Sequence, residues 1–236
     1  IEAGTPVSLY ENRRVLVLTP DGTRSCPLPM LVRLLRETIG ERAAGLDFMV
    51  ALGTHPVLTE QQILNLYGVS PAERKGLFRR SRFSCHRWDM PETFRRVGEL
   101  TEEEVAMISG GLLRERVPID INKSIFDYDL ILILGPVFPH EVVGFSGGAK
   151  YLFPGISGGE FLHFFHWLGA LITCRKIIGN KDTPVRRVID RAMEAIDQPV
   201  HCLAMVVDGE TGLRGLFVGD VREAWSAAAD LSAKIH

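Results

Sequence analysis

Cysteine is scarce in this sequence, and its spacing is irregular. The four cysteines include no CxxC pair and are Cys26, Cys85, Cys174 and Cys202. Zinc ribbons and secreted disulfide frameworks both need closely spaced or abundant cysteines, so the pattern disfavours both classes. We therefore expect reduced thiols and a cytoplasmic protein.

Long apolar runs and an excess of charge of either sign are also missing. The longest runs, such as the five apolar residues at 130–134, are far shorter than the roughly 20 that a membrane helix needs, and no signal peptide opens the chain. Lys and Arg number 27 against 29 Asp and Glu, which gives no electrostatic case for nucleic acid or an anionic membrane. The expected partner is therefore a small molecule.

Short runs rich in leucine or β-branched residues alternate along the chain with segments of helical periodicity. Such runs are typical of strands buried on both faces, and we predict strands at residues 14–18, 48–52, 130–134 and 203–207. The helical spacing predicts crossover helices at residues 28–38, 59–67, 183–195 and 221–235.

This alternation predicts an α/β fold, doubly wound, with a mostly parallel sheet and helices on both faces, which is a Rossmann-like arrangement. Thr59 and Thr101 precede runs of glutamate and glutamine and are expected to cap helices. The arginine-rich stretch at residues 70–96 has no clean period, so a short helix and irregular surface connections are expected there.

Three of the predicted strands end in loops that carry polar side chains. Asp21 and Arg24 follow the first strand, His55 follows the second, and His140 follows the strand at 130–134. In open α/β sheets, ligands bind at the carboxyl ends of the strands, where loops and helix N-termini converge. We therefore expect these four side chains to share one crevice.

Each of these residues also has a structural alternative. Asp21 could form a turn with Gly22, and Arg24 could pair with Asp21 at the surface. His55 and His140 each lie beside a proline on a tight loop, where a lone histidine most often binds backbone. Their joint occurrence at corresponding strand ends favours the functional interpretation.

A glycine-rich run, Gly144-Phe-Ser-Gly-Gly-Ala-Lys150, follows His140. Its glycines let backbone amides approach an anion, and Lys150 can supply a cation or an amine nucleophile, although a generic glycine turn is the alternative. The run lacks the Walker A frame. His163 and His166 then lie one turn apart on a predicted buried helix, where metal binding is possible but a core histidine bound to backbone is commoner.

The motifs Asp21-Gly-Thr-Arg24, Gly53-Thr-His-Pro56 and Pro139-His-Glu-Val-Val-Gly-Phe-Ser-Gly-Gly-Ala-Lys150, followed by Pro154-Gly155 and His166, occur in this order in one known family. Over nearly its whole length the sequence resembles the N-terminal domain of the lactate racemase family, which contains nickel-pincer nucleotide-dependent 2-hydroxyacid racemases and epimerases. The resemblance implies proton-coupled hydride transfer between a small 2-hydroxyacid and a covalently bound pyridinium mononucleotide whose thioamide and thioacid groups hold nickel.

The same resemblance implies that residues 1–236 form a single catalytic and cofactor-binding domain, with the family's C-terminal domain absent from this chain. That domain and the cofactor-biosynthesis proteins are the expected partners, and the activity of the isolated domain is left open. Preparations made without the biosynthetic proteins are expected to lack the cofactor.

Residue roles follow from the resemblance. Lys150 would carry the cofactor through a thioamide, and His166 would ligate nickel, a metal that imidazole suits. His55 and His140 would form the acid/base pair that accepts the hydroxyl proton of either enantiomer.

Cofactor and substrate contacts are implied for residues of the same motifs. Arg24 would orient an anionic group, and Asp21 would anchor a cofactor hydroxyl or Arg24 itself. Further contacts to the cofactor would come from Thr23 and from backbone amides around the phosphate at Ser146, Gly147 and Gly148.

The sequence departs from the family pattern near the expected substrate. Pro56 and Val57 follow His55 where the family usually has Arg-Pro, and Ser25 and Cys26 precede Pro27. These departures leave open which hydroxyacid is used. An aromatic group could favour a larger or less polar substrate or simply fill the core, and it comprises Phe164, Phe165 and Trp167.

Two other functions remain as alternatives. A conventional nucleotide-dependent dehydrogenase would suit the alternation of strands and helices, but the first strand ends in Thr19-Pro-Asp-Gly-Thr23 rather than in a GxGxxG turn. A non-catalytic nucleotide- or metal-binding domain would be expected to have lost His55 or His140, and both are present.

Overall fold

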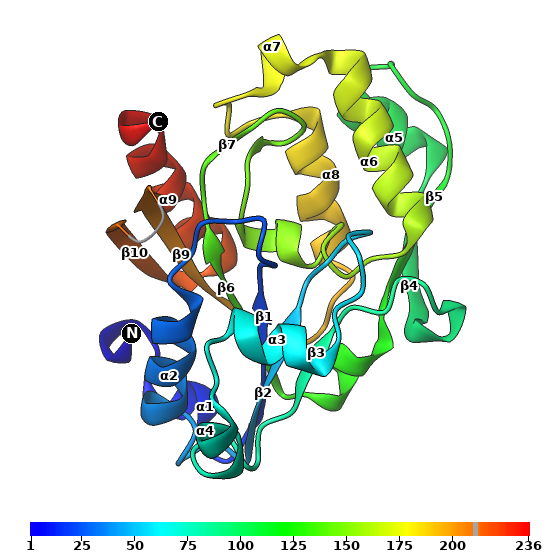
Figure 1. Cartoon of the computed structure of the whole chain (residues 1–236). Helices are drawn as coiled ribbons and strands as arrows, with labels where there is room; N and C mark the ends of the chain where they lie inside the picture. Colours follow the sequence, from blue (N-terminus) through cyan, green and yellow to red (C-terminus); the bar gives the residue numbers. More distant parts are fainter. Residues whose placement is uncertain (210–211) are drawn as a thin grey trace.

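The computed structural model describes residues 1–209 and 212–236. A six-stranded sheet in the order β10-β9-β6-β1-β2-β3 forms its centre (Figure 1). The strands of this sheet are β1 (Arg14–Thr19), β2 (Gly45–Val50), β3 (Phe83–Cys85), β6 (Leu130–Pro136), β9 (Val200–Asp208) and β10 (Gly212–Asp220). Neighbouring strands are parallel except for β9 and β10, which are antiparallel. This arrangement confirms the predicted α/β class.

Helices cover both faces of the sheet because side chains of the central strands alternate between two cores. Leu16 and Leu18 of β1 belong to the core shared with α5, α6, α8 and α9, whereas Val15 and Val17 belong to the core shared with α1, α2 and α3. The helices are α1 (Val7–Tyr10), α2 (Leu28–Thr38), α3 (Glu60–Leu66), α4 (Pro71–Lys75), α5 (Glu102–Ser109), α6 (Gly159–Ile172), α7 (Cys174–Ile177), α8 (Pro184–Met193) and α9 (Val221–Ile235).

Smaller elements complete the fold. Two antiparallel pairs lie outside the main sheet, β4 (Phe94–Leu100) with β5 (Val117–Asn122) and β7 (Pro139–His140) with β8 (Gly144–Phe145). Short 3₁₀ helices are η1 (Glu2–Gly4), η2 (Pro91–Thr93), η3 (Lys123–Asp127) and η4 (Gly148–Tyr151). No helix within residues 1–209 and 212–236 combines the length and the apolar character that a membrane crossing requires.

The predicted elements at the centre of the sheet are confirmed with small shifts of their ends. Thr59 and Thr101 each form a capping box at the start of α3 and α5, as expected. The expectation for residues 70–96 was wrong in part, because this stretch contains α4 but also β3, which extends the main sheet beside β2. A strand of three residues is too short to carry a periodic signal.

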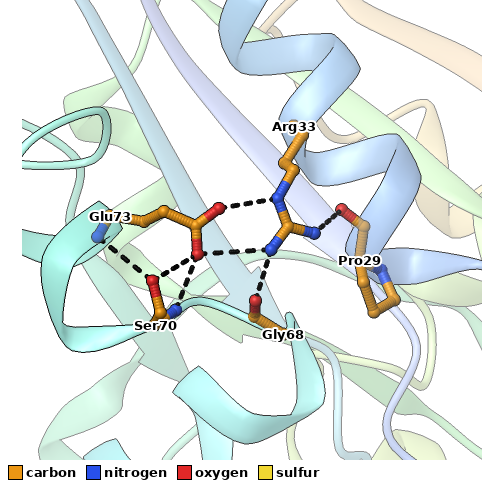
Figure 2. A network of polar contacts seen from close by, with 5 residues as sticks. All are labelled: Pro29, Arg33, Gly68, Ser70 and Glu73. Carbon is orange, nitrogen blue, oxygen red and sulfur yellow. Dashed lines mark hydrogen bonds and ion pairs between the residues drawn. The ribbon is translucent and has the colours of Figure 1, made fainter.

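A polar network fastens α4 and the turn before it to α2 (Figure 2). The Nε atom of Arg33 donates to Oε1 of Glu73 at 2.8 Å, and its Nη2 donates to the carbonyl of Gly68 at 2.6 Å. Glu73 also accepts from the N–H and hydroxyl of Ser70, which caps α4. Arg33 and then Ser70 lower the pKa of Glu73 to about 2. The network holds the chain between α3 and β3 against the second helix.

The loops that form the site follow the carboxyl ends of the central strands. β1 lies between β2 and β6 with parallel neighbours on both sides. Along the chain, the connection from β1 leads to β2 on one side, while β6 and β9 extend the sheet on the other. Ligand-binding crevices of open α/β sheets form outside the strand ends at such a switch point.

Candidate active site at the carboxyl edge of the sheet

A cleft of about 280 Å³ lies beyond the carboxyl ends of β1, β2 and β6. Chemically active side chains from the strand loops, from η4 and from α6 line it together: Asp21, Arg24, His55, His140, Lys150, Tyr151 and His166. The residues that the sequence motifs singled out therefore do share one crevice, although more than a hundred positions separate some of them. Tyr151 also lines the cleft, although the motifs did not indicate it.

Asp21 and His55 form a hydrogen-bonded pair at one wall of the cleft. Oδ2 of Asp21 lies 2.5 Å from Nδ1 of His55, while Oδ1 accepts from the N–H and the hydroxyl of Thr23 at 3.1 and 2.6 Å. Burial alone would raise the pKa of the Asp21 carboxyl, but the hydrogen bonds from Thr23 and His55 outweigh it and lower the pKa below its usual value. A carboxylate only accepts, so Nδ1 of His55 carries a proton, and Nε2 is the acceptor of the neutral ring.

This geometry revises the expectations for the first motif. Asp21 does form a turn, in which its carboxylate accepts from Thr23 rather than making the turn expected with Gly22. Of the two roles expected for Asp21, an anchor for Arg24 finds no ion pair among the described residues, and an anchor for a cofactor hydroxyl stays a prediction. Both hydrogen-bond donors of Thr23 are taken up by the Asp21 carboxylate, so Thr23 supports Asp21 rather than presenting a free donor.

The backbone of His55 is held from two sides. Nε1 of Trp88, in the loop after β3, donates to the carbonyl oxygen of His55 at 2.8 Å. Two residues earlier, the N–H of Gly53 donates to the carbonyl of Gly155 at 2.8 Å. Nearly half of the His55 side chain remains exposed, at 48%. The loop is thus fixed by its main chain while the imidazole stays accessible.

His140 differs from His55 in its burial and in which ring nitrogen carries the proton. Its side chain is buried, and its Nδ1 accepts from the backbone N–H of Val142 at 3.1 Å. Burial and the charges of Lys150 and Arg24 lower the pKa of His140 to about 3, so the ring is neutral at neutral pH. The proton then lies on Nε2, which makes His140 a donor where His55 is an acceptor. The carboxylate of Glu141 lies 3.4 Å from the same Nδ1.

Lys150 extends from η4 into the cleft without an acidic partner in the described part of the chain. Burial, followed by the charges of Arg24 and Arg186, lowers the pKa of Lys150 to about 8. Its Nζ lies 5.8 Å from the centre of the Phe165 ring. A neutral amine is a nucleophile, and this lysine has a substantial neutral fraction close to physiological pH.

His166 has one ring nitrogen that could ligate a metal. Its Nδ1–H donates to the carbonyl of Leu162, one turn earlier on α6, at 2.8 Å. Nε2 is therefore the bare nitrogen, which matches the usual arrangement of metal-bound histidines. His163 is exposed and does not line the cleft, so the two histidines do not act as a pair. In the portion of the chain that is described, no three His, Cys, Asp or Glu side chains group as a metal site.

Arg24 supplies positive charge to the cleft. Its guanidinium lies 5.4 Å from the centre of the Phe138 ring and makes no ion pair among residues 1–209 and 212–236. A guanidinium without a protein carboxylate is available to bind a carboxylate or phosphate through two parallel hydrogen bonds.

The glycine-rich loop is held from behind by two residues that the sequence did not indicate. Arg186 of α8 donates to the carbonyls of Phe145 and Gly147, and Nε1 of Trp225 on α9 donates to the carbonyl of Ser146 at 2.8 Å. The Arg186 guanidinium also stacks on the Trp225 ring at 4.1 Å. Three consecutive carbonyls therefore point away from the cleft toward these helices.

The three predicted phosphate ligands of this loop differ in what they can offer. The N–H of Ser146 donates to Phe138 and its hydroxyl donates to Pro136, so the expectation of a free donor at Ser146 was wrong. Gly148 packs against Trp225 and does not line the cleft. Gly147 lines the cleft, and its N–H has no partner in the described part of the chain.

The aromatic group on α6 belongs mainly to the core. Phe164 and Phe165 are 6% and 1% exposed and are absent from the cleft lining, whereas Trp167 is 56% exposed on the outer side of the helix. Core packing therefore explains the two phenylalanines, and the group forms no wall around a substrate.

Comparisons with known proteins identify the family to which this chain is similar. The chain matches the sequence model of the family described as "Lactate racemase N-terminal domain" over residues 6–177. It is similar to the lactate racemase of Thermoanaerobacterium thermosaccharolyticum, at 24% identity over 94% of this chain and 48% of that protein. It is also similar to the lactate racemase of Lactiplantibacillus plantarum, at 25% identity over 92% of this chain and 47% of that protein.

Solved structures share the fold. A crystal structure of a protein from Thermotoga maritima matches with a TM-score of 0.86 at 32% identity, covering 96% of this chain and 56% of that one. The lactate racemase apoprotein from Thermoanaerobacterium thermosaccharolyticum matches with a TM-score of 0.75 at 22% identity, covering 95% of this chain and 50% of that one. The chain spans about half the length of the curated relatives that it matches.

Proposed function

Because this chain belongs to the family of lactate racemase N-terminal domains, we propose that it holds the cofactor and transfers the protons in a 2-hydroxyacid racemase or epimerase. The observation that supports the proposal most is one cleft that contains a low-pKa amine, a bare imidazole nitrogen and two histidines of opposite tautomer. Each of these groups has a separate task in such a reaction.

The residues present fit a nickel-pincer nucleotide. Lys150 would hold the cofactor covalently, since its lowered pKa leaves part of the amine neutral. His166 would bind the nickel through Nε2, since an imidazole nitrogen is a suitable ligand for this metal. When bound, this group would supply the hydride-transfer chemistry that the protein side chains lack.

His55 is the proposed base for one enantiomer. Its bare Nε2 would accept the hydroxyl proton of the substrate, and the Asp21 carboxylate would stabilise the imidazolium that forms. Because Nδ1 already donates to Asp21, the ring needs no rearrangement before it accepts.

His140 is the proposed acid/base group for the other enantiomer. In its neutral form its Nε2–H would hydrogen-bond to the substrate oxygen, since Nδ1 accepts from Val142, and only the imidazolium formed by taking up a proton would return one to the substrate. To accept a proton at Nε2, it would place its own proton on Nδ1, where the Glu141 carboxylate lies 3.4 Å away. The two histidines would thus exchange the roles of donor and acceptor between the two directions of the reaction.

Arg24 is the proposed anchor of the substrate carboxylate. It is a cation without an ion-pair partner in the described residues, and it lines the same cleft as both histidines. A carboxylate held there would bring the neighbouring C2 hydroxyl toward the histidines. A small 2-hydroxyacid is therefore the proposed substrate class.

The proposed partners are a second domain and the proteins that make the cofactor. The curated relatives are about twice as long as this chain, which supports a further domain that completes the site. Neither rival function gains support, because the turn after β1 presents Asp21 and Arg24 in place of a glycine-rich phosphate turn, and both histidines line the cleft.

The test is intact-mass and metal analysis of the chain expressed together with the family's cofactor-biosynthesis proteins. We expect one adduct on Lys150 and one nickel per adduct. Lys150→Ala should remove both, whereas Lys176→Ala, which changes an exposed lysine on α7, should remove neither. An unmodified Lys150 under these conditions would refute the proposal.

A further inference from the structure

Tyr151 lines the cleft next to Lys150, and nothing assigned so far uses it. The residue is only 9% exposed, yet its hydroxyl has no hydrogen-bond partner among the described residues. The Tyr151 hydroxyl does not belong to the small set of side-chain atoms that lack both solvent contact and a hydrogen-bond partner. A phenol hydroxyl that has no protein partner and is not sealed off is free to donate to a ligand bound in the cleft that Tyr151 lines.

The fold makes room for this hydroxyl at a specific place. A Cβ at Gly135, near the carboxyl end of β6, would lie 1.9 Å from Oη of Tyr151 and 2.2 Å from its Cζ. The phenol therefore packs directly against the backbone of the central strand, and only glycine permits it. The packing against β6 therefore sets the position of the phenol oxygen.

The surroundings of Tyr151 define the ligand chemistry. Arg24 and Lys150 line the same cleft, and neither has an acidic partner in the described part of the chain. Two carboxylates line this cleft as well, and both face other groups: Asp21 is hydrogen-bonded to Thr23 and His55, and Glu141 lies 3.4 Å from Nδ1 of His140. An anion is therefore attracted to this end of the cleft, and a neutral O–H beside it can donate to one of the anion's oxygens.

We propose that Tyr151 is an anion-binding residue, whose hydroxyl donates to an oxygen of the phosphate or carboxylate held by Arg24. This inference deepens the proposed function and rests on it, because it gives the cleft a second, neutral donor for the cofactor phosphate or the substrate carboxylate. Burial raises the pKa of the Tyr151 phenol well above its usual value, so the donor proton is kept throughout the neutral range.

The experiment labels the tyrosines with carbon-13 at Cζ and follows their signals by NMR. The chain has four tyrosines, and Tyr151→Phe assigns the signal of Tyr151. Inorganic phosphate and lactate are titrated separately, so the two arms distinguish a phosphate from a carboxylate. Tyr128→Phe is the matched control, since its hydroxyl is also buried but binds Asp47 away from the cleft.

We expect at least one probe to shift the Tyr151 signal, and Tyr151→Phe to weaken the binding of that probe about tenfold, as expected for a hydrogen bond to a charged oxygen. Tyr128→Phe should bind the probe like the unaltered chain. A Tyr151 signal that neither probe moves, or a Tyr151→Phe variant that binds with unchanged affinity, overturns the inference. Such a result does not bear on the Lys150 adduct, so the proposed function would stand. A missing adduct with intact anion binding would refute only the proposed function.

Discussion

Asp21 and His55 are joined by a hydrogen bond of 2.5 Å between Oδ2 and Nδ1, although 34 positions separate them in the chain. The loops after β1 and β2 bring them together, and Trp88 fixes the His55 backbone from a third strand end. The carboxylate selects one tautomer of the ring and leaves Nε2 facing outward. This pair supplies the orientation that a catalytic base requires.

Replacing the carboxylate should disable the base without removing the cofactor. We expect Asp21→Asn to lower kcat for the 2-hydroxyacid by about three orders of magnitude, because an amide no longer enforces the Nδ1–H tautomer or stabilises an imidazolium. Nickel content should stay the same. Asp182→Asn is the control, since the Asp182 side chain forms a surface ion pair with Arg187 away from the cleft. A variant with nearly full kcat would show that Asp21 has no role in proton transfer.

Stability should decrease as the pH falls from about 6.5 toward 3. The pKa of His140 is lowered to about 3 and that of His86 to about 4 from a usual 6.5, so in this window the unfolded chain binds protons that the folded chain does not. Each histidine contributes a slope of up to about 1.4 kcal/mol per pH unit. Urea unfolding at a series of pH values measures it.

His140→Asn provides the matched comparison. Its unfolding free energy should change less steeply with pH than that of the unaltered chain, because one of the two buried neutral rings is gone. Parallel curves over this pH range would mean that His140 is not held neutral by the fold.

The ionisation of Lys150 should respond to its neighbours. Removing a nearby positive charge favours the ammonium, so Arg24→Gln should raise the pKa of Lys150 above about 8. NMR titration of lysines that carry carbon-13 methyl groups measures this value. Arg114→Gln is the control, because it removes a surface ion pair with Glu103, and it should leave the pKa of Lys150 unchanged. A Lys150 that titrates like an exposed lysine in the unaltered chain would contradict the account.

The glycine-rich loop should tolerate no side chain at Gly148. Its φ is +59°, and an added Cβ would lie 2.9 Å from the Trp225 ring. Gly148→Ala should therefore lower the free energy of unfolding by about 1–3 kcal/mol. Gly159→Ala should not destabilise the fold, because that position has open space and a negative φ. Equal melting temperatures for the two variants would show that this packing is unimportant.

The centre of the fold was predictable from sequence because its strands have an unambiguous pattern. All seven residues of β6 are buried, so its apolar run could belong only to a strand covered on both faces. β10 is partly exposed along its length and β3 has three residues, so neither carries a clear period. The sequence consequently predicts the parallel core and misses the two edges of the sheet.

The site residues that belong to contiguous sequence motifs were predictable. His55, His140 and Lys150 each follow a strand in a recognisable run, and the structure brings them to one cleft. Arg186 and Trp225 lie 39 and 79 positions from the carbonyls they bind, and no local pattern marks them. Such supporting residues are defined by tertiary packing, which a single sequence does not encode locally.

The central claim is that His55 and His140 transfer protons on opposite sides of one substrate. The most direct test is a chiral assay of racemisation, started from each enantiomer, on the cofactor-loaded protein with its proposed second domain, carrying His55→Ala or His140→Ala, with His163→Ala as the exposed control. We predict a loss of at least about a hundredfold for the first two variants and unchanged turnover for the third. Wild-type turnover by either His55→Ala or His140→Ala, with nickel retained, would contradict the account.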